Sequence, residues 1–118
     1  MPDANQDCLF CKILVGDIPA DIIFESDTAI AFRDINAQAP THVVIIPRKH
    51  IATINDIGEA DQVIVGSLYL AASAIARDEG IAEVGYRVVM NCNAAAGQTV
   101  FHIHLHLLGG RALGWPPG

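Results

Sequence analysis

The sequence has no cluster of basic residues and no long apolar run. Seven Lys and Arg stand against 13 Asp and Glu, for a formal net charge of −6. Binding to a nucleic-acid backbone needs clustered basic residues, so we expect no nucleic-acid polymer as partner. The uninterrupted apolar runs are only a few residues long. A membrane-spanning helix needs about 20, so we expect no membrane association.

Cysteine is scarce as well. An odd total of three argues against a disulfide framework. The first residues, 1–7, are mostly polar and acidic, unlike a secretory signal peptide. These features predict a cytoplasmic protein with a flexible tail over residues 1–7 and a single domain over 8–118.

Apolar residues, by contrast, are abundant. They make up 52% of the chain, and the mean hydropathy is +0.37. Roughly 45–50% is usual for soluble domains. A domain of this length buries only about two-thirds of the surface that its unfolded chain exposes. A second copy that covers the excess apolar surface is therefore expected, and we predict a homodimer.

The pattern of elements predicts an α+β fold with an antiparallel sheet. A short helix is expected from Asp7, as its N-cap, to about Val15. A long helix is expected over 59–79, because Ile64, Leu68, Ala71 and Ile75 form one apolar stripe. Gly80 would close it. The expected strands are 22–25, 28–34, 43–46, 86–90 and 100–108.

The last of these strands carries alternating histidines. Side chains alternate across a strand, so His102, His104 and His106 should share one face, about 7 Å apart. The apolar residues between them would point into the core. Three interpretations are open at this point: a solvated polar face, a zinc site built on His-x-His, or a nucleophilic imidazole flanked by helpers.

The loop before this strand favours the nucleophile. Gly97, Gln98 and Thr99 form a short turn whose backbone N–H groups could hold phosphate oxygens. No Gly-x-x-x-x-Gly-Lys loop and no acidic magnesium motif is present. Phosphoryl or nucleotidyl transfer without a divalent ion on the phosphate is therefore expected, with imidazoles and backbone donors stabilising the charge.

The run His102-Ile-His-Leu-His-Leu-Leu resembles the signature of the histidine-triad (HIT) family, and other segments resemble its Hint-type branch. These are Asp17-Ile18-Pro19-Ala20, Ala31-Phe32-Arg33-Asp34-Ile35, Gln38-Ala39-Pro40-Thr41-His42, Ile46-Pro47-Arg48-Lys49-His50, Gly97-Gln98-Thr99, Gly109-Gly110-Arg111 and Trp115-Pro116-Pro117-Gly118. The resemblance implies the HIT fold, with about five strands, one long helix and one short helix, and a sheet extended across a homodimer. It also implies hydrolysis of purine nucleoside 5′-phosphoramidates through a covalent nucleotidyl-histidine.

The resemblance further implies catalytic roles for individual residues. His104 would be the nucleophile, with its Nδ1–H donated to a backbone carbonyl and Nε2 free for attack. His106 would contact the α-phosphate, and His42 would orient the triad. His102 completes the triad, and Thr99 would lie near the leaving group.

The same resemblance implies a nucleotide pocket. Asp34 would accept hydrogen bonds from the ribose hydroxyls, since a carboxylate suits a diol. Asn91 would contact sugar or phosphate, and Gly97 and Gln98 would contact phosphate. An apolar slot for the purine would be formed by Phe10, Ile13, Ile18, Phe32 and Ile35.

Cys8 and Cys11 lie three residues apart, on one face of the expected short helix. Either they are two small buried apolar side chains, or they bind a metal. Relatives among histidine-triad proteins and galactose-1-phosphate uridylyltransferases carry such a pair in a zinc site. That resemblance implies Cys8, Cys11, His50 and His102 as ligands of a structural zinc with no open position. If His102 ligates zinc, it cannot also serve as a free proton relay.

Two other functions remain open from the sequence. The chain could be a zinc-dependent hydrolase that uses the triad as ligands. It could also be a nucleotide-binding regulatory module whose hydrolysis is incidental.

Overall fold

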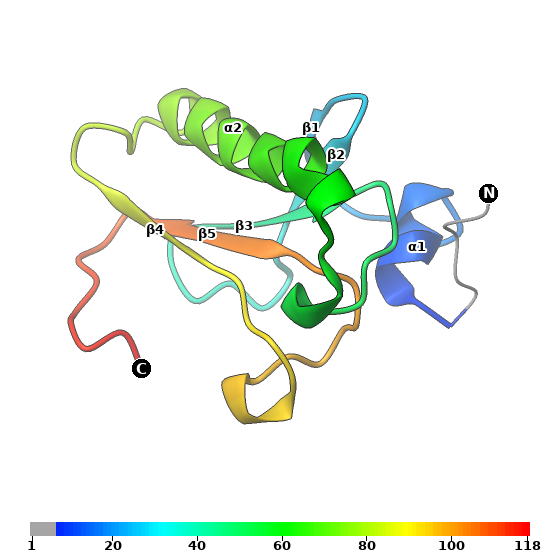
Figure 1. Ribbon diagram of the computed structural model, residues 1–118. Coiled ribbons are helices and arrows are strands. Elements are labelled where there is room, and N and C mark those ends of the chain that lie inside the picture. Colours follow the sequence, from blue (N-terminus) through cyan, green and yellow to red (C-terminus); the bar gives the residue numbers. More distant parts are fainter. Residues whose placement is uncertain (1–6) are drawn as a thin grey trace.

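The computed structural model describes residues 7–118, in which a five-stranded antiparallel sheet lies between a long helix and a short one (Figure 1). The strand order is β1-β2-β3-β5-β4. The elements are α1 (Leu9–Leu14), β1 (Ile22–Glu25), β2 (Ala29–Arg33), β3 (Thr41–Pro47), α2 (Gln62–Asp78), β4 (Tyr86–Val89) and β5 (Leu105–Gly109), with 3-10 turns at Ile54–Asp56, Glu59–Asp61 and Ala94–Ala96. This is the predicted α+β architecture with an antiparallel sheet.

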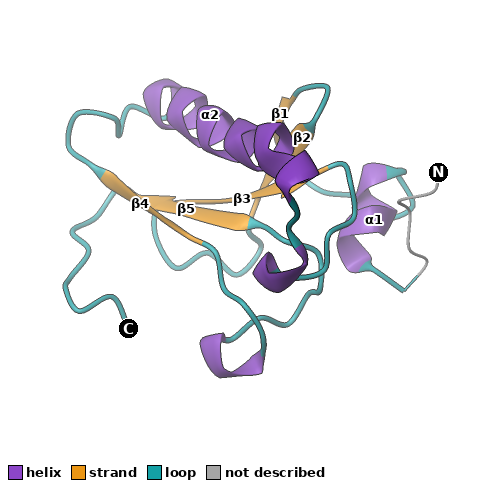
Figure 2. Ribbon diagram, viewed as in Figure 1, coloured by secondary structure: helices purple, strands orange, loops and turns teal. Residues whose placement is uncertain are grey.

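The two faces of the sheet carry different cores. Alternate residues of β3 separate them: Val43 and Ile45 face α2, whereas Val44 and Ile46 face α1. Helix α2 lies along the first face (Figure 2), and its residues Leu68, Ala71 and Ile75 are buried there. The side of the sheet that carries α1 is therefore the side on which even-numbered residues of β3 and β5, including His42 and His106, are placed.

The ends of both helices differ from the sequence-based expectation. Cys8, and not Asp7, is the N-cap of α1, and its Sγ accepts the backbone N–H of Cys11 at 3.3 Å. This start places both thiols on the buried side of α1. The long helix begins as a 3-10 turn, and its α-helical part starts only at Gln62, because the Asp61 carboxylate accepts the Gly58 N–H and holds that first turn tight.

The last strand is also shorter than expected. Residues 100–104 approach the sheet in non-ladder conformation, and β5 begins at Leu105. The pairing of β3 with β5 ends at Ile45 and Leu105, and β3 itself ends at Pro47. The carbonyl of Pro47 accepts a hydrogen bond from the imidazole of His102. The predicted alternation nevertheless persists, because Ile103 is buried in the core under α2.

The other expected strands are placed correctly, with ends that differ by one or two residues; β3 grows at both ends, to Thr41 and Pro47. Among residues 7–118, no helix is both long and apolar enough to cross a membrane.

Candidate active site and metal centre

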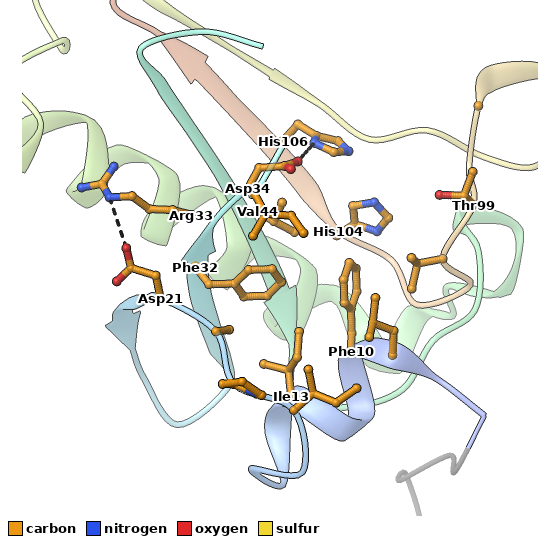
Figure 3. Close-up of a pocket in the computed structure, with 17 residues that line it drawn as sticks. Phe10, Ile13, Asp21, Phe32, Arg33, Asp34, Val44, Thr99, His104 and His106 are labelled. Carbon is orange, nitrogen blue, oxygen red and sulfur yellow. Dashed lines mark ion pairs between the residues drawn. The ribbon is translucent and has the colours of Figure 1, made fainter. Parts of the chain in front are cut away.

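A cavity of about 360 Å³ opens on the α1 side of the sheet (Figure 3). Its walls come from α1, from the end of β2, from the loop before β5 and from the histidine segment. The lining residues are Leu9, Phe10, Ile13, Ile18, Pro19, Ala20, Asp21, Phe32, Arg33, Asp34, Ile35, Val44, Gly97, Thr99, Val100, His104 and His106. All five residues expected in the purine slot are among them, so an apolar pocket adjoins two histidines, the carboxylates of Asp21 and Asp34, and Arg33.

His104 is held by one strong hydrogen bond. Its Nδ1 lies 2.8 Å from the backbone carbonyl of His102, and because a carbonyl only accepts, Nδ1 carries the proton and Nε2 keeps its lone pair. The ring is buried against the edge of Phe10, with centroids 5.0 Å apart. Burial lowers the pKa of His104 below its usual 6.5. At neutral pH this imidazole is uncharged and able to act as a nucleophile.

His42 and His106 form a hydrogen-bonded pair whose tautomers can be assigned from one backbone contact. The N–H of Gln38 donates to His42 Nδ1 at 3.0 Å, so the proton of His42 is on Nε2. That Nε2 lies 2.9 Å from His106 Nδ1. His106 therefore accepts at Nδ1 and carries its own proton on Nε2, as a donor beside His104. Burial lowers the pKa of His106 to about 4, and the neighbouring His104 and His42 act in the same direction.

Asp34 follows β2 and lies beside this histidine pair. One oxygen accepts the N–H of Asn36 at 2.9 Å. The other is 3.3 Å from His42 Nε2 and 3.9 Å from His106 Nδ1, the latter drawn as a dashed line in Figure 3. The carboxylate lines the cavity with its side chain 20% exposed. Each carboxylate oxygen offers two acceptor positions, so Asp34 can still accept hydrogen bonds from a ligand.

Two of the three backbone amides that the sequence suggests for phosphate binding, those of Gly97 and Gln98, make hydrogen bonds within the loop before β5. The N–H of Gly97 donates to the Ala94 carbonyl, and the N–H of Gln98 donates to the Asn93 carbonyl. Both amides thus serve the turn itself, which the αL conformation of Gly97 (φ +90°) closes. The Thr99 side chain, in contrast, lines the cavity, and its hydroxyl points towards His104 (Figure 3).

Gln98 instead fixes the shape of this loop. Its side chain is buried, its Nε2 donates to the carbonyls of Ala52 and Val100, and its Oε1 accepts the N–H of Asn93. Asn91 and Gln98 both lie outside the cavity lining. Their expected nucleotide contacts are therefore not supported by direct access, and Gln98 is a support for the loop that carries Thr99.

A second cluster lies deeper, between α1, the segment after β3 and the approach to β5. Nδ1 of His102 lies 3.4 Å from the sulfur of Cys8 and 3.5 Å from that of Cys11, which is 3.3 Å from Nδ1 of His50. The two imidazole Nδ1 atoms are 3.2 Å apart. Tetrahedral zinc with bonds of about 2.3 Å to sulfur and 2.0–2.1 Å to nitrogen places such ligands about 3.5 Å (S to N) and 3.3 Å (N to N) apart. The four atoms fit one zinc ion.

The surroundings of His102 suit this role. Its Nε2 donates to the Pro47 carbonyl at 2.8 Å, which fixes the proton on Nε2 and leaves Nδ1 free to bind a metal. Burial lowers the pKa of His102 to about 4, so the ring is neutral as a ligand must be. The side chain is fully buried and faces the thiols. His102 therefore meets the thiols and His50 as buried polar partners, whereas His104 and His106 line the cavity.

Asp34, His42 and His106 also lie close enough together to be considered as metal ligands. The proton on His42 Nε2 opposes this, because moving it to Nδ1 would set two N–H groups of His42 and Gln38 against each other. The triad does not converge on one ion either, since His102 faces the thiols and His104 Nδ1 faces a carbonyl. The described geometry therefore favours a closed metal centre beside a metal-free pocket.

Comparison with known proteins agrees with this geometry. A family model of the HIT domain matches residues 15–113. The chain is 50% identical to a purine nucleoside phosphoramidase of Escherichia coli K12 over 109 residues, 92% of each chain. Among solved structures, it resembles a HIT family hydrolase from Legionella pneumophila, with a TM-score of 0.93 and 55% identity, covering 95% of this chain and 100% of the other. A HIT family hydrolase from Clostridium thermocellum gives 0.91 and 49%, covering 93% and 96%.

Proposed function

The chain belongs to the HIT family, and we propose that it hydrolyses the P–N bond of purine nucleoside 5′-phosphoramidates through His104. The observation that carries the proposal is the His104 tautomer. A neutral ring with its proton held on Nδ1 presents an Nε2 lone pair beside a pocket that contains an apolar slot and a carboxylate. The identity to a protein named purine nucleoside phosphoramidase supports the same bond as the target.

The substrate would bind with its base in the apolar slot and its ribose hydroxyls on Asp34. Phe10 and Phe32, whose rings meet edge to face with centroids 5.5 Å apart, give flat apolar surface next to the slot. Stacking and shape select a purine, while a slot without polar side chains discriminates poorly between adenine and guanine. The position of the α-phosphate is then set between His104, His106 and Thr99.

The reaction would proceed in two displacements. First, Nε2 of His104 forms a bond to the α-phosphorus while the P–N bond breaks; the leaving nitrogen takes a proton from solvent and departs as the amine, and His106 keeps its proton and donates its Nε2–H to a phosphate oxygen. Then water attacks the phosphorus, its proton passes to solvent, and the bond to His104 breaks, which returns His104 to the neutral state. The products are a nucleoside monophosphate and an amine. Neutral His104 and protonated Nε2 of His106 are the required starting states, and their hydrogen bonds support both.

We also propose that Cys8, Cys11, His50 and His102 hold a structural zinc ion. The Cys/His cluster can bind a metal on geometric grounds, and four protein ligands leave no open coordination position. Zinc there would stabilise the fold and would not touch the substrate. The protein would reside in the cytoplasm, where thiols stay reduced and disulfides are rare.

The assembly that we propose is a homodimer with the sheets joined across a two-fold axis. On α2, Val63 and Leu70 are 79% and 74% exposed, and β4 is an edge strand paired only with β5 among the described strands. An unpaired edge beside exposed apolar side chains suits an isologous contact. Trp115, 82% exposed, would pack near the partner's pocket. Light scattering at micromolar concentration should give twice the chain mass; a monomer would contradict the assembly.

The enzymatic proposal is tested by comparing an adenosine phosphoramidate with ATP and with diadenosine polyphosphates under identical conditions. The phosphoramidate should be turned over best, and acid-free quenching should trap a nucleotide covalently on His104, located by peptide mass spectrometry. Tight AMP binding without turnover of any phosphoramidate would instead indicate a nucleotide-binding module.

A further inference from the structure

The metal centre and the nucleotide pocket share residues at their boundary. His102 contributes its side chain to the metal cluster, and its backbone carbonyl accepts the Nδ1–H of His104 at 2.8 Å. The imidazole of His102 therefore belongs to the proposed metal centre, while the backbone carbonyl of the same residue orients His104, the proposed nucleophile. A displacement of His102 moves the acceptor that sets the orientation and tautomer of His104.

Helix α1 makes a second connection. Its two cysteines flank Phe10, which turns into the pocket, where the Phe10 ring contacts His104 and Phe32 with centroid separations of 5.0 and 5.5 Å. Phe10 also meets His102 at 6.0 Å. Leu9, Phe10 and Ile13 of α1 all line the cavity. The pocket wall thus stands on the helix that supplies both thiols.

Helix α1 depends on its attachments. A helix of six residues is far too short to be stable by itself in water. Its backbone hydrogen bonds run within the segment, as from Lys12 N–H to the Cys8 carbonyl and from Asp17 N–H to the Lys12 carbonyl. It is fastened to the sheet by apolar side chains and by the thiols that meet His50 and His102. A metal ion on those four ligands would replace the contacts between α1, the segment after β3 and the segment before β5 with coordination bonds.

We propose that metal binding and nucleotide binding are positively coupled through His102 and Phe10. The inference rests on the proposed function, which assigns zinc to one site and a purine nucleotide to the other. A bound metal ion would order α1 and the His102 carbonyl before the nucleotide binds. The nucleotide would then bind to a pocket whose wall and nucleophile are already in place. Coupling between sites is reciprocal, so bound nucleotide must raise the affinity for the metal by the same factor. We expect a factor of about ten, within the roughly 5- to 150-fold range usual for such couplings.

The test measures metal affinity and needs no turnover. Zinc-loaded protein is titrated with a chromophoric chelator, with and without saturating AMP, and the metal that remains on the protein gives the affinity ratio. Cobalt(II) is used in parallel, because its thiolate charge-transfer bands report occupancy of this site. Should the metal-free form aggregate, the rate of zinc release to the chelator gives the comparison, and AMP should slow it by a similar factor.

Matched variants locate the coupling. Phe10→Ala should bring the AMP effect on metal affinity close to one even at saturating AMP. Ile35→Ala removes an apolar side chain at the exposed rim of the same pocket, and it should weaken AMP binding yet keep the coupling factor. Cys92→Ser, at a thiol outside the cluster, should keep both.

The outcomes separate this inference from the function on which it rests. If loaded wild type binds AMP but its metal affinity is the same with and without AMP, the coupling is refuted and the proposed function stands. If AMP binds to neither the metal-loaded nor the metal-free protein, the proposed nucleotide pocket is refuted, and the coupling is refuted with it. Protein that takes up neither zinc nor cobalt rejects both the metal centre and the coupling.

Discussion

The two histidine clusters of this protein lie side by side and differ in what surrounds them. In the proposed metal centre, His50 and His102 meet two thiols, and both rings face the sulfur atoms with Nδ1. In the pocket, His42 and His106 meet each other and a carboxylate, and the cavity opens beside His106, while His42 is buried behind it. Ring centroids in each pair are about 5 Å apart, 5.0 Å in the centre and 5.1 Å in the pocket. Spacing between imidazoles therefore does not decide their chemistry.

The partners of the second ring nitrogen account for the difference. A carbonyl on Nε2 of His102 leaves Nδ1 free for a metal, whereas a carbonyl on Nδ1 of His104 leaves Nε2 free for phosphorus. A backbone N–H on His42 makes it a donor towards His106. Main-chain hydrogen bonds thus leave opposite ring nitrogens available in His102 and His104, two neighbouring histidines of one motif.

Removal of the proposed nucleophile should have the largest effect of all on turnover in the pocket, and almost no effect on metal binding at the proposed metal centre. His104→Gly is expected to lower turnover of an adenosine phosphoramidate by at least about a thousandfold, as loss of nucleophiles does elsewhere. Zinc content and AMP affinity should stay close to wild type, since the base and ribose contacts lie elsewhere in the pocket. A variant that keeps more than about one-hundredth of the rate would remove His104 from the nucleophile's role.

The reverse pattern is expected for the metal ligands. Cys8→Ser combined with Cys11→Ser should abolish zinc binding, measured by elemental analysis, from about one ion per chain. Structural zinc contributes about 10–16 kcal/mol in isolated zinc fingers. Even a third of that would lower the melting temperature by more than about 10 °C, since 1 kcal/mol corresponds to roughly 3–6 °C in a domain of this size.

The matched control for the cysteine variants is Cys92→Ser, whose thiol lies outside the cluster. It should keep its zinc and melt within a few degrees of wild type. Freshly purified wild-type protein that contains no metal would contradict the structural zinc directly.

A moderate effect is expected at Asp34, on the pocket side. Loss of one ribose hydroxyl leaves part of a mostly buried carboxylate without a partner, at a cost of about 1–3 kcal/mol. 2′-Deoxy phosphoramidates should therefore react roughly ten- to a hundredfold less efficiently than ribo forms, while adenosine and guanosine substrates stay within about tenfold. Asp34→Ala should remove most of the ribose preference and leave base preference unchanged. Equal kcat/KM for ribo and deoxy forms in wild type would show that Asp34 does not bind the ribose.

The last effect concerns acid stability, where the titration of His106 can be separated from that of the proposed metal ligands. Its pKa in the folded protein, about 4, lies below the ordinary 6.5. Between pH 6.5 and pH 4, His106 therefore binds a proton in the unfolded chain but stays neutral in the folded protein. The stability is therefore intact above pH 6.5 and is lost progressively as the pH falls towards 4. This pKa shift corresponds to roughly 3 kcal/mol.

His106→Gln removes that titration, so its melting temperature should fall less than that of wild type between pH 6.5 and 4.5. Acid release of zinc from the proposed metal centre would affect both proteins alike and would cancel in the difference. Parallel pH profiles for the two proteins would mean that His106 is not held neutral by its surroundings.

Much of the fold could be predicted from periodicity. The alternation at Val43 and Ile45, and the stripe through Leu68 and Ile75, place core residues correctly because burial imposes a period of 2 on strands and 3.6 on helices. The errors lie at ends: the N-cap at Cys8, the 3-10 turn before Gln62 and the late start of β5. Each end is set by side-chain contacts with residues that are distant in sequence, or by capping choices that periodicity does not register.

The site divides in the same way. Resemblance in sequence pointed to His104, Asp34 and the purine slot, and these residues line one cavity. It suggested phosphate-binding amides at Gly97 and Gln98, which the turn uses for itself. No pattern signalled the N–H of Gln38 or the carbonyl of Pro47, because main-chain groups carry no residue identity. Phe10 was expected only as part of the slot, and its contacts with His102 and His104 became visible only in the fold.

The sequence alone determined the family, the alternation that buries Ile103, Leu105 and Leu107, and the set of residue types that a metal centre and a nucleotide pocket require. Only the tertiary structure decided which histidines of the triad face the Cys/His cluster and which line the pocket. Nothing within residues 102–106 distinguishes three histidines at equal spacing. The distinction arises because Cys8, Cys11 and His50 come to lie against the first of them, and Gln38, through His42, against the last, and such long-range contacts exist only once the chain has folded.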